Sequence, residues 1–290
     1  MEKLSFSGHE SFQCRNLWLK KGYEFNTAQN KFTNDLAVVE LGVGKNMVAS
    51  IRYWLKAFDL LDDDGKNKVI ASTLFDSNVG KDPYIEDIGT LWLLHYQLVA
   101  ANKASIYHLF FNYFRKQRIE FSKQHLMNHL ISECNYRDEK HSENTIETDI
   151  GVLLKSYVRP NLKEGSKDIE DSYSSLLIDL DLIKAIAERK DWYECKNEFR
   201  ATLPMEIVFY TILINPKFSK STSISFYHLL NDENSPGLVF GLDADSLLKY
   251  IQLISEQYDG VVYKEDAGVR ELQFNTKPKA SDVLEAYYEK

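Results

Sequence analysis

The chain has few cysteines, few prolines and no long hydrophobic run. Three cysteines among 290 residues are too few and too scattered for a disulfide framework, which favours reduced thiols in a cytoplasmic protein. Six prolines and 13 glycines exclude collagen-like and low-complexity chains. The apolar run Leu91–Leu94 ends at His95, and residues 1–15 hold no apolar segment of signal-peptide length. We therefore expect neither secretion nor contact with a membrane.

Positive charge is also scarce. The 35 Lys and Arg are outnumbered by 43 Asp and Glu, so the formal net charge is −8. This balance opposes nonspecific binding of nucleic acid by the molecule as a whole. The charge is unevenly distributed, since residues 1–60 carry eight Lys/Arg against six Asp/Glu, and residues 101–137 carry six against two. Two stretches of an acidic chain are therefore net basic.

The hydrophobic share of 44%, with 13% aromatic residues, is typical of a folded protein. A length of 290 residues exceeds that of most single cores. A polar passage at residues 76–83 indicates a linker or long loop. We predict three domains, which span residues 1–80, 84–200 and 201–290.

The clearest local pattern is a pair of helices joined by a glycine turn. A short helix is predicted over residues 35–41 and ends at Gly42-Val43-Gly44. A longer helix follows from Lys45 to about Leu61, with one buried stripe made by Met47, Ile51, Trp54, Leu55 and Phe58. This is the helix-turn-helix arrangement, whose second helix faces the DNA groove. Residues 60–70 then predict a strand, a glycine turn and a second strand, which would form the wing of a winged helix.

The last 90 residues follow a similar order. Helices are predicted over residues 203–214, beginning at Pro204, and over residues 223–230. Asp243 caps another helix, and residues 261–274 form a hairpin. The outward face of the capped helix offers only one cation, Lys249, and one anion, Glu256, so we expect this module to contact protein.

Four amphipathic helices are predicted between these two ends. They span residues 85–101, 105–118, 122–134 and 145–157. The predicted fold class is therefore mainly α with small β-hairpins (α+β). Winged helix-turn-helix modules lie at the N- and C-terminal ends, around a helical middle.

Two groups of residues raise the possibility of metal or covalent chemistry. One is the run His125, His129, Cys134 and His141, whose first two members share a helix face as zinc ligands do. The run lacks paired cysteines and a glutamate beside the first histidine, so we predict no metal and expect exposed or hydrogen-bonded histidines. The other group is His9, Glu10, Cys14 and Arg15, in which a cysteine near a cation can become a nucleophile. A packed aromatic segment explains these residues without chemistry, so we predict no catalytic residue and leave a Cys14-based activity open.

Two segments carry a resemblance to a known family. They are Ser7-Gly8-His9-Glu10-Ser11-Phe12-x-Cys14-Arg15-x-x-Trp18-Leu19-Lys20-Lys21-Gly22 and Leu41-Gly42-Val43-Gly44-Lys45-Asn46-Met47-Val48-x-Ser50-Ile51-Arg52-Tyr53-Trp54. With them the chain resembles the prokaryotic domain-of-unknown-function family 4007 over nearly its whole length. The family has no assigned activity, and the resemblance implies a component of defence islands encoded near proteins of DNA phosphorothioation. It also implies sulfur-transfer or ATPase proteins of the same system as partners, and it transfers no catalytic residue.

The basic face of the predicted second helix lies within the segment that carries the resemblance. The predicted DNA-binding residues are Lys45, Asn46, Ser50, Arg52, Lys56, Lys66 and Lys68. Asn46 and Ser50 suit base edges, and the cations suit phosphates, with Lys66 and Lys68 on the wing. We predict a non-enzymatic component of a prokaryotic DNA-modification and phage-defence system that binds double-stranded DNA and needs no cofactor. The alternative is a docking scaffold without DNA binding, favoured by the acidic total and by Asp62-Asp63-Asp64 beside the wing.

Overall fold

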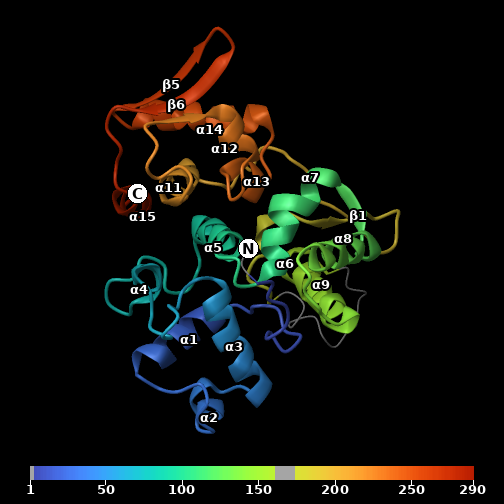
Figure 1. Ribbon diagram of the computed structural model, residues 1–290. Helices are drawn as coiled ribbons and strands as arrows, with labels where there is room; N and C mark the ends of the chain where they lie inside the picture. Colours follow the sequence, from blue (N-terminus) through green and yellow to red (C-terminus); the bar gives the residue numbers. More distant parts are fainter. Residues whose placement is uncertain (1–2, 161–173) are drawn as a thin grey trace. The chain divides into compact units, whose positions relative to one another are not determined.

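The chain folds into two compact units, and the computed structural model describes residues 3–160 and 174–290 (Figure 1). The first unit spans Met1–Cys195 and the second Lys196–Lys290. The described part of each unit combines helices with a small antiparallel three-stranded sheet, so the predicted mixed α+β class is confirmed. A division of the first unit at residues 80–84 stays a prediction. No helix within the described ranges has the length and apolar character needed to cross a membrane.

The first unit begins with short helices that pack closely. They are α1 (Trp18–Thr27), α2 (Ala37–Leu41), α3 (Lys45–Ala57) and α4 (Val69–Phe75). Gly22 of α1 lies so near α3 that a Cβ atom there would be 2.7 Å from both Ile51 Cγ2 and Leu55 Cδ1. The buried stripe predicted for α3 therefore packs against α1, and both helices of the predicted pair are present.

The predicted wing after α3 is largely wrong. Its pairing is reduced to an isolated bridge between Leu61 and Asn67, and α4 begins at Val69, where the second strand was expected. The Asn67 amide donates to the Thr27 hydroxyl of α1 at 2.8 Å, which ties this turn to a helix. The buried residues that follow are Ala71, Leu74 and Phe75, and their spacing of three and four positions is helical.

All four predicted middle helices are confirmed. They are α5 (Ile88–Ala100), α6 (Ser105–Leu109) continued by a π-helical turn η1 (Phe110–Phe114) and by α7 (Arg115–Gln117), α8 (Lys123–Tyr136) and α9 (Glu143–Tyr157). Their core is strongly aromatic, with Trp92, Phe110, Phe111, Phe114 and Tyr157 almost fully buried. The structure adds a 3-10 turn η2 (Ile178–Leu180) and a sheet of β1 (Glu120–Ser122), β3 (Trp192–Glu194) and β2 (Lys184–Ala185), in that order. The sequence reasoning did not predict this sheet, because its strands are only two or three residues long.

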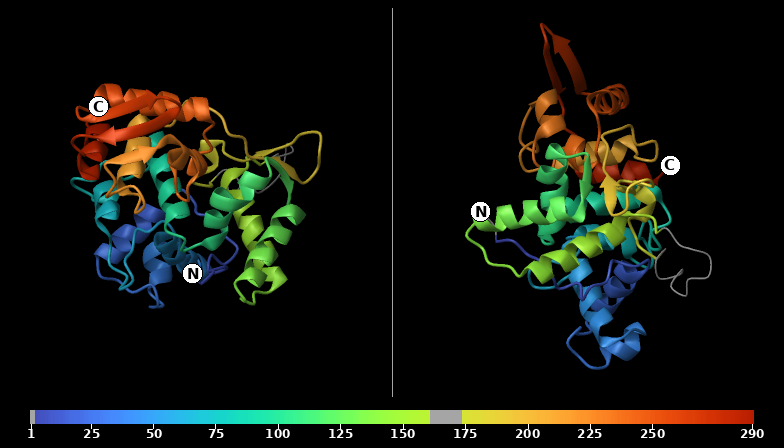
Figure 2. Two further views of the ribbon diagram at one scale, coloured as in Figure 1. Left: turned by 45° about the horizontal axis from the view of Figure 1, so that its top comes forward. Right: turned by 90° about the vertical axis from the view of Figure 1, so that its right-hand side faces the viewer.

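The second unit follows the predicted order with one correction. Its elements are α11 (Met205–Ile214), β4 (Ser223–Ser225), α12 (Phe226–Asn231), α13 (Pro236–Val239), α14 (Ala244–Gln257), β5 (Val261–Asp266), β6 (Val269–Phe274) and α15 (Ala280–Tyr288). Asp243 caps α14 by accepting from the Ser246 N–H at 2.8 Å, as predicted. Residues 223–225 form a strand rather than the first turn of a helix, because Ile224 pairs with Leu272 on β6 and is buried there. The hairpin of β5 and β6 projects from the helices of its unit (Figure 2).

Candidate functional site

The turn between α2 and α3 positions one exposed helix face. Gly42 ends α2 in a left-handed conformation (φ 65°), and Gly44 precedes α3 with an extended one. The buried side of α3 consists of Val48, Ser50, Ile51, Trp54, Leu55 and Ala57. The opposite side carries Lys45, Asn46, Arg52 and Lys56, all exposed, and we call these four residues the α3 face. No ion pair holds its three cations among the described residues.

The two wing lysines have different surroundings. Lys66 is exposed, and its backbone N–H donates to the Asp62 carboxylate at 2.8 Å. Lys68 is half-buried, and its ammonium group lies 2.6 Å from Asp59. A phosphate at Lys68 would have to compete with this carboxylate. Lys66 is therefore the better placed of the two for an external anion.

The prediction that Ser50 contacts a base edge is wrong. Its side chain is fully buried, and its hydroxyl donates to the backbone carbonyl of His9 at 3.1 Å. Ser50 follows Met47 by three positions and precedes Trp54 by four, so helix geometry places it on the buried stripe. Of the two residues predicted at base edges, only Asn46 is accessible.

The N-terminal segment is anchored by a buried histidine and a buried carboxyl group. Asp149 of α9 accepts from the Ser7 N–H at 3.0 Å and lies 2.9 Å from His9 Nε2. The Ser11 N–H donates to His9 Nδ1 at 3.1 Å, which leaves the ring proton on Nε2, pointing at Asp149. Both side chains are almost inaccessible, at 3% and 1% exposure, so this pair fixes the path of the chain.

The same segment also contacts α3. Trp54 Nε1–H donates to the Phe12 carbonyl at 3.2 Å, and Gly8 (φ 97°) lies directly against the Tyr53 ring. The two segments that carry the family resemblance therefore pack against each other. The buried residues of these two segments stabilise the fold, whereas the residues of the α3 face are exposed.

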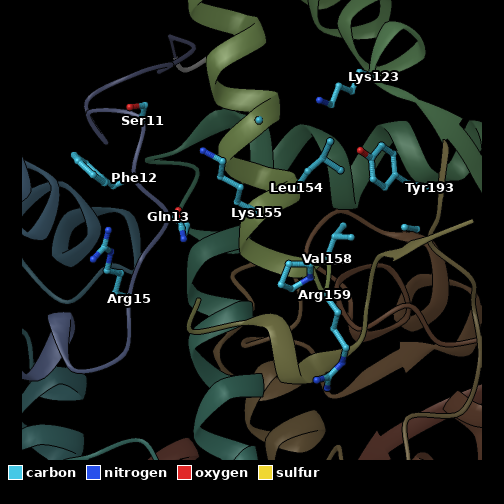
Figure 3. Close-up of a pocket in the computed structure, with 13 residues that line it drawn as sticks. Ser11, Phe12, Gln13, Arg15, Lys123, Leu154, Lys155, Val158, Arg159 and Tyr193 are labelled. Atoms are coloured by element: carbon cyan, nitrogen blue, oxygen red, sulfur yellow. The ribbon is translucent and has the colours of Figure 1, made fainter. Parts of the chain in front are cut away.

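A pocket of about 620 Å³ opens in the first unit beside this segment (Figure 3). Within the described part of the chain its charged lining residues are all cationic: Arg15, Lys123, Lys155 and Arg159. They come from the N-terminal segment, from the start of α8, and from α9 and the residues just after it. The other lining residues are Ser11, Phe12, Gln13, Gly151, Leu154, Val158, Pro160, Ala185 and Tyr193. The sequence reasoning missed this site, because its cations lie up to 144 positions apart in the chain.

Comparison with family models decides the family. A model described as a protein of unknown function (DUF4007) matches residues 6–288. The chain belongs to the DUF4007 family. This DUF4007 chain is also similar to two crystal structures of SspB. The magnesium ion-bound one has a TM-score of 0.84, 29% identity, and coverage of 98% of this chain and 88% of that chain. The second SspB structure has a TM-score of 0.83 and 28% identity at the same coverage. No match was found among curated proteins.

The histidine and cysteine run does not form a metal cage in this DUF4007 chain. His125 Nδ1 accepts from the Ser122 N–H at 3.2 Å, which makes it part of the cap of α8. His129 packs against the Phe114 ring, and burial lowers its pKa. His141 lies 3.1 Å from Glu139. Within residues 3–160 and 174–290 no three His, Cys, Asp or Glu side chains converge as a metal site would need, so the structure offers no preformed cage for magnesium or zinc.

Cys14 has the environment of an unreactive thiol. It is buried, with 3% exposure, and burial raises its pKa well above the usual value. Its Sγ lies 3.9 Å from the Arg15 carbonyl. We expect iodoacetamide at pH 7 to leave Cys14 unmodified in the folded protein and to alkylate it after denaturation, as read by peptide mass spectrometry. Rapid labelling of native Cys14 would instead support a nucleophile.

Proposed function

We propose that this protein is a non-enzymatic, DNA-binding component of a prokaryotic DNA-modification and phage-defence system related to phosphorothioation. It contacts double-stranded DNA through the α3 face, with Asn46 toward base edges and Lys45, Arg52 and Lys56 on phosphates. The observation that carries the proposal is this exposed set of cations on the second helix of a glycine-turn pair. The family membership supplies the context of the system, since the resemblance implies neighbouring phosphorothioation proteins.

In this proposal the second unit acts as a winged-helix module, and the first unit acts through its helix pair. The second unit supports it through its element order, since β4 joins the edge of the β5–β6 hairpin, with β6 in the centre of the sheet. In the first unit only the helix pair and the Leu61–Asn67 bridge are present, so its wing is a short turn. Lys66 adds a phosphate contact from that turn.

A docking scaffold without DNA binding is the second candidate. Two observations favour it: the exposed carboxylates of Asp63 and Asp64 lie in the short turn, and α14 exposes Asp245 and Glu256 beside a single cation, Lys249. The partners in this case are sulfur-transfer or ATPase proteins of the same system. The two candidates are compatible if the first unit holds DNA and the second holds protein.

The test is fluorescence anisotropy of a labelled random-sequence duplex, titrated with the full chain at about 50 and 200 mM salt. Four exposed cations that each neutralise one phosphate give a slope of log K against log salt of about −3.6. The double substitution Lys45→Glu/Arg52→Glu reverses two of them, so we expect binding to weaken by about 100-fold and the slope to fall by about 1.8. Asn46→Ala tests base contacts by changing sequence preference while keeping the slope.

A matched control reverses two exposed lysines elsewhere in the first unit. Lys140→Glu/Lys190→Glu changes the net charge by the same amount and is expected to weaken binding much less than the α3 substitutions. Equal losses in both double variants would contradict a localised site. No binding at low salt by protein that circular dichroism shows to be folded would leave the docking scaffold, whose partner a pull-down would identify. Parallel reactions in EDTA and in magnesium chloride test the non-enzymatic part, since a cleaved strand on a denaturing gel would contradict it.

A further inference from the structure

We propose that the cationic pocket beside the N-terminal segment binds a nucleoside phosphate, with the phosphate on its cations and the nucleoside against its apolar wall. The site shares no residue with the α3 face and does not depend on the proposed DNA contact. A free nucleotide and a nucleotide at the end of a DNA strand would make the same contacts, with the phosphate on the cations and the nucleoside on the apolar wall.

The charge of the lining is the first argument. Acidic residues outnumber basic ones in this chain, 43 to 35, yet the four charged residues that line the pocket among residues 3–160 and 174–290 are all Lys or Arg. Cations that line one pocket raise its electrostatic potential, so an anion bound in the pocket is stabilised by them. Lys123 is also the first residue of α8, whose helix dipole places further positive potential there. Asp179 and Asp181 lie beside Arg159 and offset its charge, so the field that favours an anion such as a phosphate comes mainly from Arg15, Lys123 and Lys155.

The contacts that orient two of the cations, Arg15 and Arg159, also support the binding of a phosphate. The Arg15 guanidinium lies over the Phe12 and Trp18 rings, 5.7 and 5.5 Å from their centroids. Arg159 is oriented by Asp179 at 3.1 Å and by Asp181 at 4.0 Å. These contacts hold each guanidinium in place before a ligand arrives, while Lys123 and Lys155 are exposed. Guanidinium and ammonium groups are the side chains that bind phosphate oxygens, and the pocket has two of each.

Gly151 supplies an observation that packing does not explain. It lies in the interior of α9, where glycine is a poor helix former. A Cβ atom at Gly151 would meet no atom of the described residues within 4 Å, so none of these neighbours requires the small residue. The position lines the pocket, and its lack of a side chain keeps that wall open. A larger residue would fill the pocket without disturbing the core.

The size and the apolar wall extend the inference from phosphate to nucleoside phosphate. A volume of about 620 Å³ is that of a site for a whole small molecule and exceeds the needs of a bare anion. Leu154, Val158 and Pro160 form an apolar side, and the Tyr193 ring borders it. A base or sugar packs on such a surface, whereas inorganic phosphate gains nothing from it.

Isothermal titration of the full chain with ATP at low salt tests the proposal, with pyrophosphate and a 5′-phosphorylated thymidine pentanucleotide as parallel probes. We expect ATP to bind more tightly than pyrophosphate, Lys123→Ala/Lys155→Ala to weaken ATP binding by at least about tenfold, and Gly151→Leu to abolish it. The matched control Lys140→Ala removes an exposed lysine outside the pocket and is expected to change nothing. Tighter binding of ATP than of the pentanucleotide assigns a free nucleotide, and the reverse assigns a strand end.

Three results would overturn the proposal. One is the absence of binding by all three probes, and another is ATP binding that survives both Gly151→Leu and the double lysine substitution. The third is equal affinity for ATP and pyrophosphate, which would leave a bare anion site. Unchanged circular dichroism and melting temperature establish that Gly151→Leu is folded, and the lysine variant gives the same test without filling the pocket.

Discussion

Replacing Asp149 by alanine is expected to lower the free energy of unfolding of the first unit by about 2–4 kcal/mol. The carboxyl group is 1% exposed and is bonded to the Ser7 N–H and to His9 Nε2. Its removal leaves the buried His9 Nε2–H without an acceptor, at about 1–3 kcal/mol, takes the acceptor from the part-buried Ser7 N–H, and opens a small cavity. Chemical denaturation followed by tryptophan fluorescence measures the loss.

Two control substitutions separate the cause from general damage to α9. Asp149→Asn keeps one acceptor oxygen, so we expect it to lose less stability than the alanine variant. Glu147→Ala removes an exposed carboxylate from the same helix and is expected to cost less than about 0.5 kcal/mol. A loss below about 1 kcal/mol for Asp149→Ala would contradict the anchoring role of the pair.

Gly8→Ala is expected to destabilise the same unit by about 2–4 kcal/mol, for two reasons that add. The φ of 97° at Gly8 disfavours any side chain, and a Cβ atom would lie 2.8 Å from Tyr53 Cδ2 and 3.1 Å from Cε2. The Tyr53 ring is confined by contacts with His9 and Trp54, so it has little room to move. The midpoint and slope of a denaturant titration give the loss.

Another glycine of the chain isolates the backbone part of this effect. Gly42 also has a left-handed φ, 65°, but a Cβ atom there would meet nothing within 4 Å. Gly42→Ala should therefore cost only the backbone strain, about 1 kcal/mol. The double variant Gly8→Ala/Tyr53→Ala removes the clash and is expected to show a coupling energy of at least about 0.5 kcal/mol relative to the two single changes. Equal losses for Gly8→Ala and Gly42→Ala would contradict the contact with the ring.

Local periodicity accounts for what the sequence predicted well. The helical spacing of apolar residues located α3, the middle helices and α14, because each pattern repeats within one element. It failed at Val69 and Ile70, where β-branched residues suggested a strand but Ala71, Leu74 and Phe75 form a helical stripe. Ser50 was assigned to base edges for its place near the start of α3, whereas it lies four positions before Trp54 and on the same buried side of the helix.

The pocket shows what a single sequence does not contain. Its four cations belong to three separate stretches, and the packing of α8, α9 and the N-terminal segment brings them together. The spacing of apolar residues predicts which face of each helix is buried, but it does not predict which helices pack against each other. The His9–Asp149 pair has the same origin, since 140 positions separate its members. Gly151 was the one local signal, because a glycine inside an amphipathic helix requires an explanation.

The long reach of the N-terminal segment has a consequence for synthesis on the ribosome. Leu4, Ser7 and Asn16 donate backbone hydrogen bonds to Glu139, Asp149 and Ser174, so the first residues to emerge find their partners late. Ser7 and Asp149 are 142 positions apart, which at about 5–20 residues per second is a delay of roughly 7–30 s. During this interval the aromatic residues of the segment lack their native cover and are open to chaperones and proteases. Closure of the segment is then a late, high-contact-order step that completes the first unit.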